Sequence, residues 1–125
     1  MAFQPITTYY FERKFKKLTK KDSLLKERII RKLQEVIDNP DIGKPKRHAL
    51  LGLRSVHIDP FVVAYVIIKD TVLLINFDHH DKVYEETPKI MDVLISDSRT
   101  IGALASAGVT QEEYAAFLKS FRKRK

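Results

Sequence analysis

The sequence predicts an α+β fold, in which an N-terminal strand and a two-helix hairpin pack on a small antiparallel sheet and a C-terminal helical extension follows. Two observations predict this class. Apolar side chains recur at helical spacing over residues 11–37, and two apolar runs, 61–68 and 71–77, flank the turn dipeptide Lys69-Asp70. A chain of 125 residues has room for one modest core.

The N-terminal elements follow from local patterns. The β-branched and aromatic run Ile6–Tyr10 predicts a short strand. Residues 11–18 and 24–38 each carry an apolar stripe opposite lysines and arginines, which predicts two amphipathic helices. Asp22 or Ser23 can cap the second helix, and Asn39-Pro40 ends it.

The Gly/Pro-containing loop 41–46 leads into three strands, 53–58, 61–68 and 71–77. Alternation in the first strand places His57 on the face opposite Val56 and Ile58. If Val56 and Ile58 pack under the helices, His57 lies on the open face of the sheet. The second strand is apolar at both its odd-numbered and its even-numbered positions, as expected for a central strand covered on both faces.

The tail after residue 86 predicts three further helices, so we divide the chain into a domain of residues 1–86 and an extension of residues 87–125. One helix is expected after Pro88. Asp97 or Ser98 can cap the next, which Gly108 ends, and a capping box of Thr110 and Glu113 opens the last. The apolar stripe of the last helix consists of Tyr114, Phe117, Leu118 and Phe121. These helices could cover the open sheet face, form a homo-oligomer or imitate a helix of a binding partner.

Composition excludes several classes of protein. No apolar run approaches the roughly 18 residues of a transmembrane helix. The N-terminal segment lacks the apolar stretch of a secretory signal, and the chain has no cysteine for disulfides or thiolate metal sites. We therefore expect a cytoplasmic protein with no membrane partner.

The net charge of +7 is concentrated in residues 1–84, which carry +6. This excess is compatible with a polyanionic partner such as RNA or DNA, and equally with solubility alone. All four histidines, His48, His57, His79 and His80, lie within residues 47–84 near strand ends or turns. Because the pKa of a free imidazole is close to neutrality, their grouping indicates acid–base chemistry.

The order of these elements and several short motifs resemble the RelE/ParE superfamily of toxins from type II toxin-antitoxin pairs. The motifs are HALLG, RSVHIDP, an apolar strand with Tyr65, and a closing H-x-x-x-Y that ends at Tyr84. The residue sequence of these motifs is most similar to that of the YafQ-type branch of RelE-like mRNA endonucleases. The resemblance covers about residues 11–84.

The resemblance implies a ribosome-dependent mRNA endonuclease, in which a ribose 2′-hydroxyl attacks the adjacent phosphate without a metal or other cofactor. A cognate antitoxin, the ribosome and mRNA are the implied partners. By position, His48, His57 and His80 match acting histidines, and Tyr84 matches the closing aromatic residue. The residues expected to contact RNA are Lys46, Arg47, Arg54 and His79. Tyr65 is expected to be a core residue.

Three positions depart from the pattern of the family. Val62 and Asn76 stand where relatives carry phosphate-stabilising arginines, and Phe61 stands where an acidic residue is expected. The alternatives are therefore a ParE-like inhibitor of DNA gyrase, a catalytically lapsed RelE fold, or a plain RNA-binding module. The run Asp78-His79-His80-Asp81 lacks a third clustered ligand, so we expect no zinc site.

Overall fold

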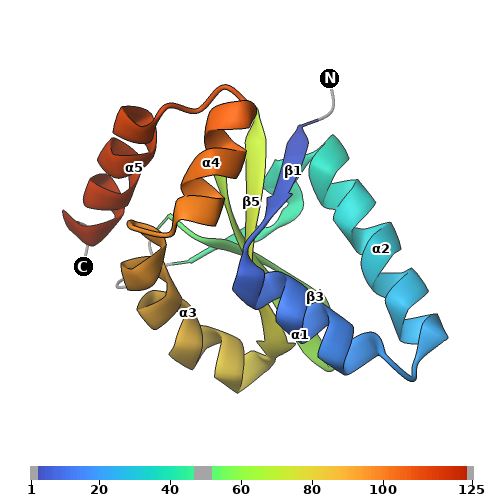
Figure 1. Cartoon of the computed structure of the whole chain (residues 1–125). Helices are drawn as coiled ribbons and strands as arrows, with labels where there is room; N and C mark the ends of the chain where they lie inside the picture. The colour runs from blue at the N-terminus through green and yellow to red at the C-terminus, as the bar shows by residue number, and fades with distance from the viewer. Residues whose placement is uncertain (1–2, 47–51, 124–125) are drawn as a thin grey trace.

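A computed structural model describes residues 3–46 and 52–123, with the side chains of residues up to 119. A five-stranded sheet in the order β1-β5-β4-β3-β2 forms its centre (Figure 1). The elements are β1 (Gln4–Thr7), α1 (Tyr9–Thr19), α2 (Ser23–Asp38), a 3-10 turn (Pro40–Ile42), β2 (Lys44–Pro45), β3 (Arg54–Ile58), β4 (Phe61–Ile68), β5 (Thr71–His79), α3 (His80–Leu94), α4 (Ser98–Ser106) and α5 (Gln111–Lys123). The predicted α+β class is confirmed.

The sheet is mixed rather than wholly antiparallel. The strands β3, β4 and β5 pair antiparallel as predicted, and Lys69 at a positive φ of 54° makes the turn between β4 and β5. However, β1 pairs parallel with β5, with Gln4 opposite Thr71. Apolar alternation is the same in parallel and antiparallel strands, so the sequence pattern did not distinguish the two directions.

The first strand and first helix meet earlier than predicted. Tyr9 and Tyr10, expected in the strand, are the first residues of α1. Thr8 causes the change, because its hydroxyl accepts a hydrogen bond from the Phe11 amide at 3.0 Å and donates one to the Ile75 carbonyl at 2.7 Å. The helix cap therefore overrides the strand propensity of the tyrosines.

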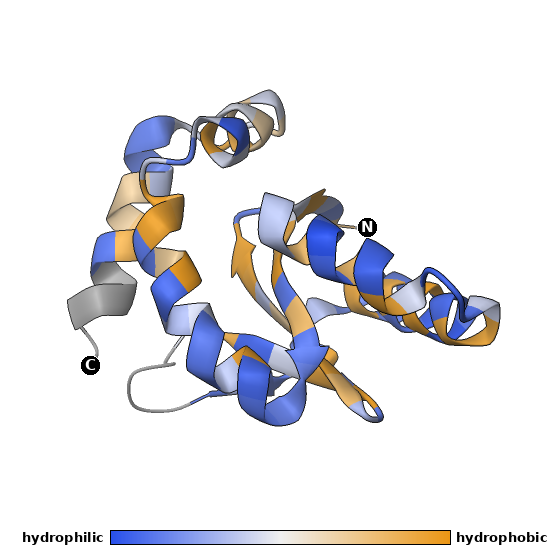
Figure 2. Ribbon diagram, turned by 60° about the horizontal axis from the view of Figure 1, so that its bottom comes forward, coloured by the Kyte–Doolittle hydropathy of each residue, from blue (hydrophilic) through white to orange (hydrophobic). Residues whose placement is uncertain are grey.

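One face of the sheet packs against α1 and α2. The core on this side joins helix residues such as Phe11, Ile29 and Val36 to sheet residues such as Val56 and Tyr65. Figure 2 shows the strands largely hydrophobic and the helices divided into a hydrophobic and a hydrophilic side. The predicted packing of Val56 and Ile58 under the helical hairpin is confirmed.

The opposite face packs against α3, α4 and α5. Its core joins Val66, Leu73 and Ile75 of the sheet to residues of all three helices, including Leu94, Leu104 and Tyr114. The described parts of the C-terminal helices therefore cover the open sheet face, which was the first of the three roles considered for them. No helix in the described segments is long and apolar enough to cross a bilayer.

The C-terminal helices have the predicted caps, but the first of these helices does not begin where predicted. Asp97 caps α4, Gly108 follows it at a φ of 92°, and Thr110 and Glu113 exchange the two capping-box hydrogen bonds at 2.9 and 3.1 Å. In contrast, α3 begins at His80 and continues through Pro88, which was expected to precede the helix. An unbroken helix therefore joins the two predicted parts of the chain.

Candidate functional site

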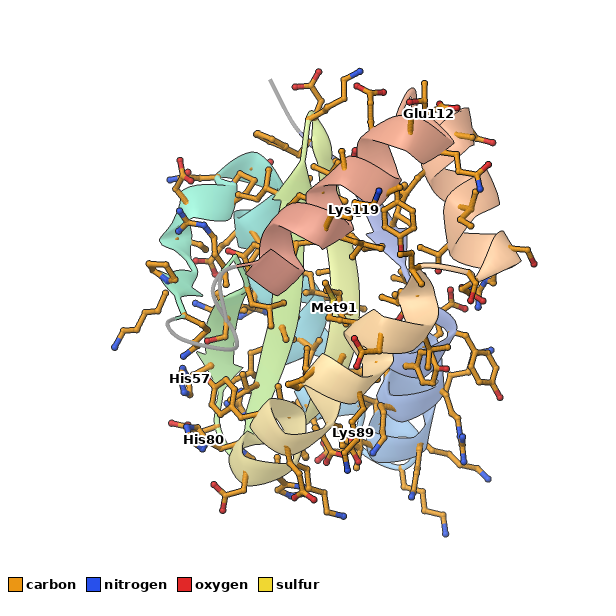
Figure 3. The ribbon with its side chains drawn as sticks, turned by 90° about the vertical axis from the view of Figure 1, so that its left-hand side faces the viewer. His57, His80, Lys89, Met91, Glu112 and Lys119 are labelled. Carbon is orange, nitrogen blue, oxygen red and sulfur yellow. The ribbon has the colours of Figure 1, made fainter. Side chains whose placement is uncertain are left out.

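His57, His80, Tyr84 and Lys46 form a cluster at one end of the sheet. The ring centroids of His57 and His80 are 5.8 Å apart, and those of His80 and Tyr84 are 4.6 Å apart in an edge-to-face arrangement. The Lys46 ammonium lies 4.6 Å from the centroid of the Tyr84 ring. Both imidazoles are exposed and point to the same side of the molecule (Figure 3). We call these four residues the histidine cluster.

Two local patterns build this cluster. Alternation in β3 turns Ser55 and His57 to the face opposite Val56 and Ile58, as predicted, and the start of α3 packs on this face. The helix α3 begins directly after β5, so His80 and Tyr84 lie one turn apart on the same helix face. The hydroxyl groups of Ser55 and Tyr84 are 3.1 Å apart and hydrogen-bonded, which holds the start of α3 against β3.

The cluster combines groups with different chemical abilities. Each of the two neighbouring imidazoles has ring nitrogens that can accept or donate a proton. The Tyr84 ring offers an aromatic surface, and the adjacent Lys46 supplies positive charge. Asp81 lies beside His80, with 3.2 Å between its carboxylate oxygen and the His80 Nδ1 atom. The arrangement can therefore take up and deliver protons beside a bound anion.

Two of the predicted RNA contacts lie away from the cluster. Arg54 is on the α2 face of the sheet, where its guanidinium donates to the carbonyls of Asp41 and Gly43 at 3.2 and 2.8 Å. His79 packs against Phe61, with 4.7 Å between the ring centroids, and its Nδ1 atom is 3.2 Å from the Asp78 carboxylate. The predicted residues Arg47 and His48 lie outside the described residues.

The two positions at which the chain lacks an arginine of its relatives are both buried. Val62 is 1% exposed and packs with Ala64 and Val83. Asn76 is 0% exposed. A register shift between β4 and β5, at Ala64 and Tyr65, turns Ile75 and Asn76 to the same face, so Asn76 lies under α3 rather than on the side that simple alternation predicts.

A second polar group lies between α1, β5 and α3, and its assembly was not predicted. The Lys14 ammonium binds the buried carboxylate of Asp78 and lies 3.5 Å from that of Glu86. Burial raises the pKa of Asp78, but hydrogen bonds from Lys14 and His79 outweigh it and the pKa lies below its ordinary value. The hydrogen bond to Asp78 raises the pKa of Lys14. Because these residues are far apart in sequence, no local spacing predicted their contact.

Comparison with known proteins finds a family and several relatives that this chain matches. Residues 6–84 match the family described as ParE toxin of type II toxin-antitoxin system, parDE. The RelE4 chain of Methanocaldococcus jannaschii is 35% identical over 79 residues, which cover 61% of this chain and 84% of that one. A Methanosarcina mazei protein is 39% identical over 74 residues, which cover 57% of this chain and 86% of that one.

Two solved structures share the fold. The RelBE2 toxin-antitoxin complex of Mycobacterium tuberculosis matches at 21% identity and a TM-score of 0.56, covering 64% of this chain and all of the matched one. A mutant of the Escherichia coli toxin RelE in the free state matches at 22% identity and a TM-score of 0.59, covering 71% and 97%. The family match ends at residue 84, so α4 and α5 lie beyond it.

Proposed function

Since the chain belongs to the ParE toxin family of type II toxin-antitoxin systems, within the RelE/ParE superfamily, we propose that it is an endoribonuclease that cleaves mRNA on the ribosome. The observation that carries this proposal is the histidine cluster. Two exposed imidazoles lie side by side, next to an aromatic ring and an ammonium group. A plain binding surface has no need for paired imidazoles.

The proposed reaction is a transesterification within the RNA strand. One imidazole takes the proton of a ribose 2′-hydroxyl, and the oxygen attacks the adjacent phosphorus. The bond from phosphorus to the 5′-oxygen breaks, and the second imidazole donates a proton to that oxygen. The products are a 2′,3′-cyclic phosphate and a 5′-hydroxyl. Tyr84 would stack on a base, and Lys46 would stabilise the charge that develops on the phosphate.

The proposed partners are a cognate antitoxin and the ribosome with its mRNA. A solved relative is a toxin-antitoxin complex, which supports an antitoxin for this chain. The charge distribution supports a large RNA partner, because residues 9–38, which contain α1 and α2, hold ten lysines and arginines against five acidic residues. Most of these cations lie on the solvent side of the hairpin.

The test is in vitro translation of a reporter mRNA with wild-type protein, His57→Ala, His80→Ala and His79→Ala. We expect the wild type to create new mRNA ends that carry 2′,3′-cyclic phosphate, mapped by primer extension. His57→Ala and His80→Ala should each slow cleavage about 100-fold or more, as expected for loss of a general acid or base. His79→Ala is the matched control, because it removes an exposed imidazole next to His80 that lies outside the cluster.

A second candidate function is inhibition of DNA gyrase without catalysis. The burial of Val62 and Asn76 favours it, because neither position can supply the phosphate-binding charge that relatives place there. Translation arrest without mRNA ends, or cleavage that is equal in the wild type and both cluster variants, would contradict the nuclease. A supercoiling assay with purified gyrase would then test the second candidate.

A further inference from the structure

A cavity of about 370 Å³ lies between α1 and α3, on the other side of α3 from the histidine cluster. Tyr10, Arg13 and Lys17 line it from one face of α1, and Lys89 lines it from α3. Asn76 of β5 lies at its floor. Figure 3 shows Lys89 on the α1 side of α3, whereas His57 and His80 lie on the opposite side. We call this cavity the α1–α3 groove.

The groove carries uncompensated positive charge. Lys14 at its centre is neutralised by Asp78 and Glu86. Arg13, Lys17 and Lys89 form no ion pair with another residue of the described chain and are exposed. Three cations therefore surround an opening in which the single lining carboxylate, Glu86, already has a partner.

The floor of the groove holds a polar group with weak contacts. Asn76 is 0% exposed, yet its amide nitrogen reaches only the Glu86 carboxylate at 3.4 Å and the Thr87 hydroxyl at 3.5 Å. Both distances are at the outer limit of a hydrogen bond. A buried amide donor with such long contacts is available to a better acceptor, such as a phosphate or a base carbonyl.

The lining thus combines cations, a buried amide donor and the ring of Tyr10. Cations bind phosphate oxygens, an aromatic ring stacks on a base, and an amide donates to a base or sugar oxygen. A simple inorganic anion could use the cations and the amide but would leave the aromatic ring without a partner. We propose that the α1–α3 groove binds a nucleoside phosphate, either as a free nucleotide or as one unit of an RNA strand. The inference concerns binding alone and holds whether or not the histidine cluster is catalytic.

The test uses the full chain with His57→Ala and His80→Ala in every sample, so that no RNA is cleaved. Binding of a short fluorescein-labelled single-stranded RNA is followed by anisotropy, and binding of adenosine 5′-monophosphate by NMR. The groove variant is Arg13→Ala/Lys17→Ala/Lys89→Ala. The control variant, Lys44→Ala/Lys82→Ala/Lys119→Ala, removes the same charge from exposed sites outside the groove and outside α1 and α2.

The groove variant should weaken RNA binding about tenfold or more and reduce the slope of log K against log salt by about 2, since each phosphate contact on a single strand contributes about 0.7. The control variant should change the affinity by less than about twofold. Glu86→Gln should tighten binding by about threefold, because it removes a repelling charge. A purely structural role for these residues predicts no such gain.

In the NMR arm, a shift of the Asn76 side-chain amide on addition of adenosine 5′-monophosphate would place a free nucleotide in the groove. Binding of the RNA with no effect of the mononucleotide would instead assign the groove to a strand. Equal losses in the two triple variants, or no binding of either probe, would overturn the inference. Because all six substituted side chains are exposed, an unchanged Tm is the check that both variants fold.

Discussion

At the scale of single residues, the contact between Tyr65 and Gly43 connects the central strand to the 3-10 turn. Tyr65 is 0% exposed, and its hydroxyl donates to the Pro40 carbonyl and accepts from the Gly43 amide at 3.0 Å. Burial raises the pKa of Tyr65, so it stays neutral as a core residue, in agreement with its predicted role. A β-carbon added at Gly43 would lie 2.1 Å from the Tyr65 hydroxyl oxygen.

We therefore expect Gly43→Ala to destabilise the protein by about 2–3 kcal/mol, because the buried ring has no room to move away. Gly102→Ala in α4 is the matched control, since a β-carbon there meets no atom within 4 Å. The control should stabilise the helix by about 0.5–1 kcal/mol. Urea unfolding of both variants checks the prediction, and a Gly43→Ala protein as stable as the wild type would contradict it.

The histidine cluster shows which residue contacts the sequence could predict. Strand alternation correctly placed His57 opposite Val56 and Ile58, and the same alternation separated Arg54 from His57. Asn76 could not be placed in this way, because the register shift in β4 and β5 arises from pairing between strands. The contacts of Lys14 with Asp78 and Glu86 depend on tertiary packing and have no local signal.

At the scale of elements, the boundaries of β1 and α3 differ most from prediction. A proline commonly occupies the first turn of a helix, which suggested a start near Pro88. The buried residues Val83, Thr87, Ile90, Met91 and Leu94 nevertheless have continuous helical spacing across that proline. The hydrophobic period, rather than the proline, was therefore the better guide to where α3 begins.

The ion pair between Lys14 of α1 and Asp78 of β5 should make the packing of α1 depend on pH. The pKa of Asp78 is lowered by folding from its ordinary value of 3.8, so its contribution is present above that value and is lost as the pH falls through the lower folded pKa. The pKa of Lys14 is raised from 10.5, so its contribution is present below 10.5 and is lost as the pH rises through the higher folded value.

We expect Asp78→Asn to reduce the free energy of unfolding by about 2 kcal/mol at pH 7, as for loss of a hydrogen bond between charged groups. The difference from the wild type should shrink at pH values below 3.8. Asp38→Asn, an exposed carboxylate at the end of α2, should change stability by less than about 0.5 kcal/mol. Chemical denaturation at pH 7 and at a pH below 3.8 measures the effect. A loss of stability that is equal at the two pH values would contradict the ion-pair explanation.

At the scale of the whole molecule, helices cover the sheet on both faces, and α5 is tied to two other parts of the chain. The Tyr114 hydroxyl donates to the Leu94 carbonyl at 2.8 Å, and Lys69 in the turn between β4 and β5 lies 3.0 Å from the Glu113 carboxylate. The sequence predicted these helices and their caps. Their position on the sheet was one of several open options, because an apolar stripe alone does not determine which surface it packs against.

We infer that α4 and α5 are required for the sheet to fold, and a chain that ends at Ile95 tests this. The truncation removes Leu104, Val109, Tyr114 and Leu118 from the core, each worth about 1.5–3 kcal/mol of burial, a sum comparable to the stability of a whole domain. We expect an unfolded or aggregated protein by circular dichroism and size-exclusion chromatography. A chain that ends at Lys119 is the control and should fold. A stable, folded monomer that ends at Ile95 would contradict the inference.

The parallel pairing of β1 with β5 also determines the order in which the protein can fold during synthesis. The partner of residues 4–7 is residues 71–74, so the first strand has no place to bind until most of the chain has left the ribosome. Until then the apolar faces of α1 and α2, with Phe11 and Ile29, have no sheet to cover. Such long-range closure is slow compared with helix formation. The nascent chain therefore passes through a stage with an exposed, adhesive helical hairpin, in which chaperone binding or aggregation competes with folding.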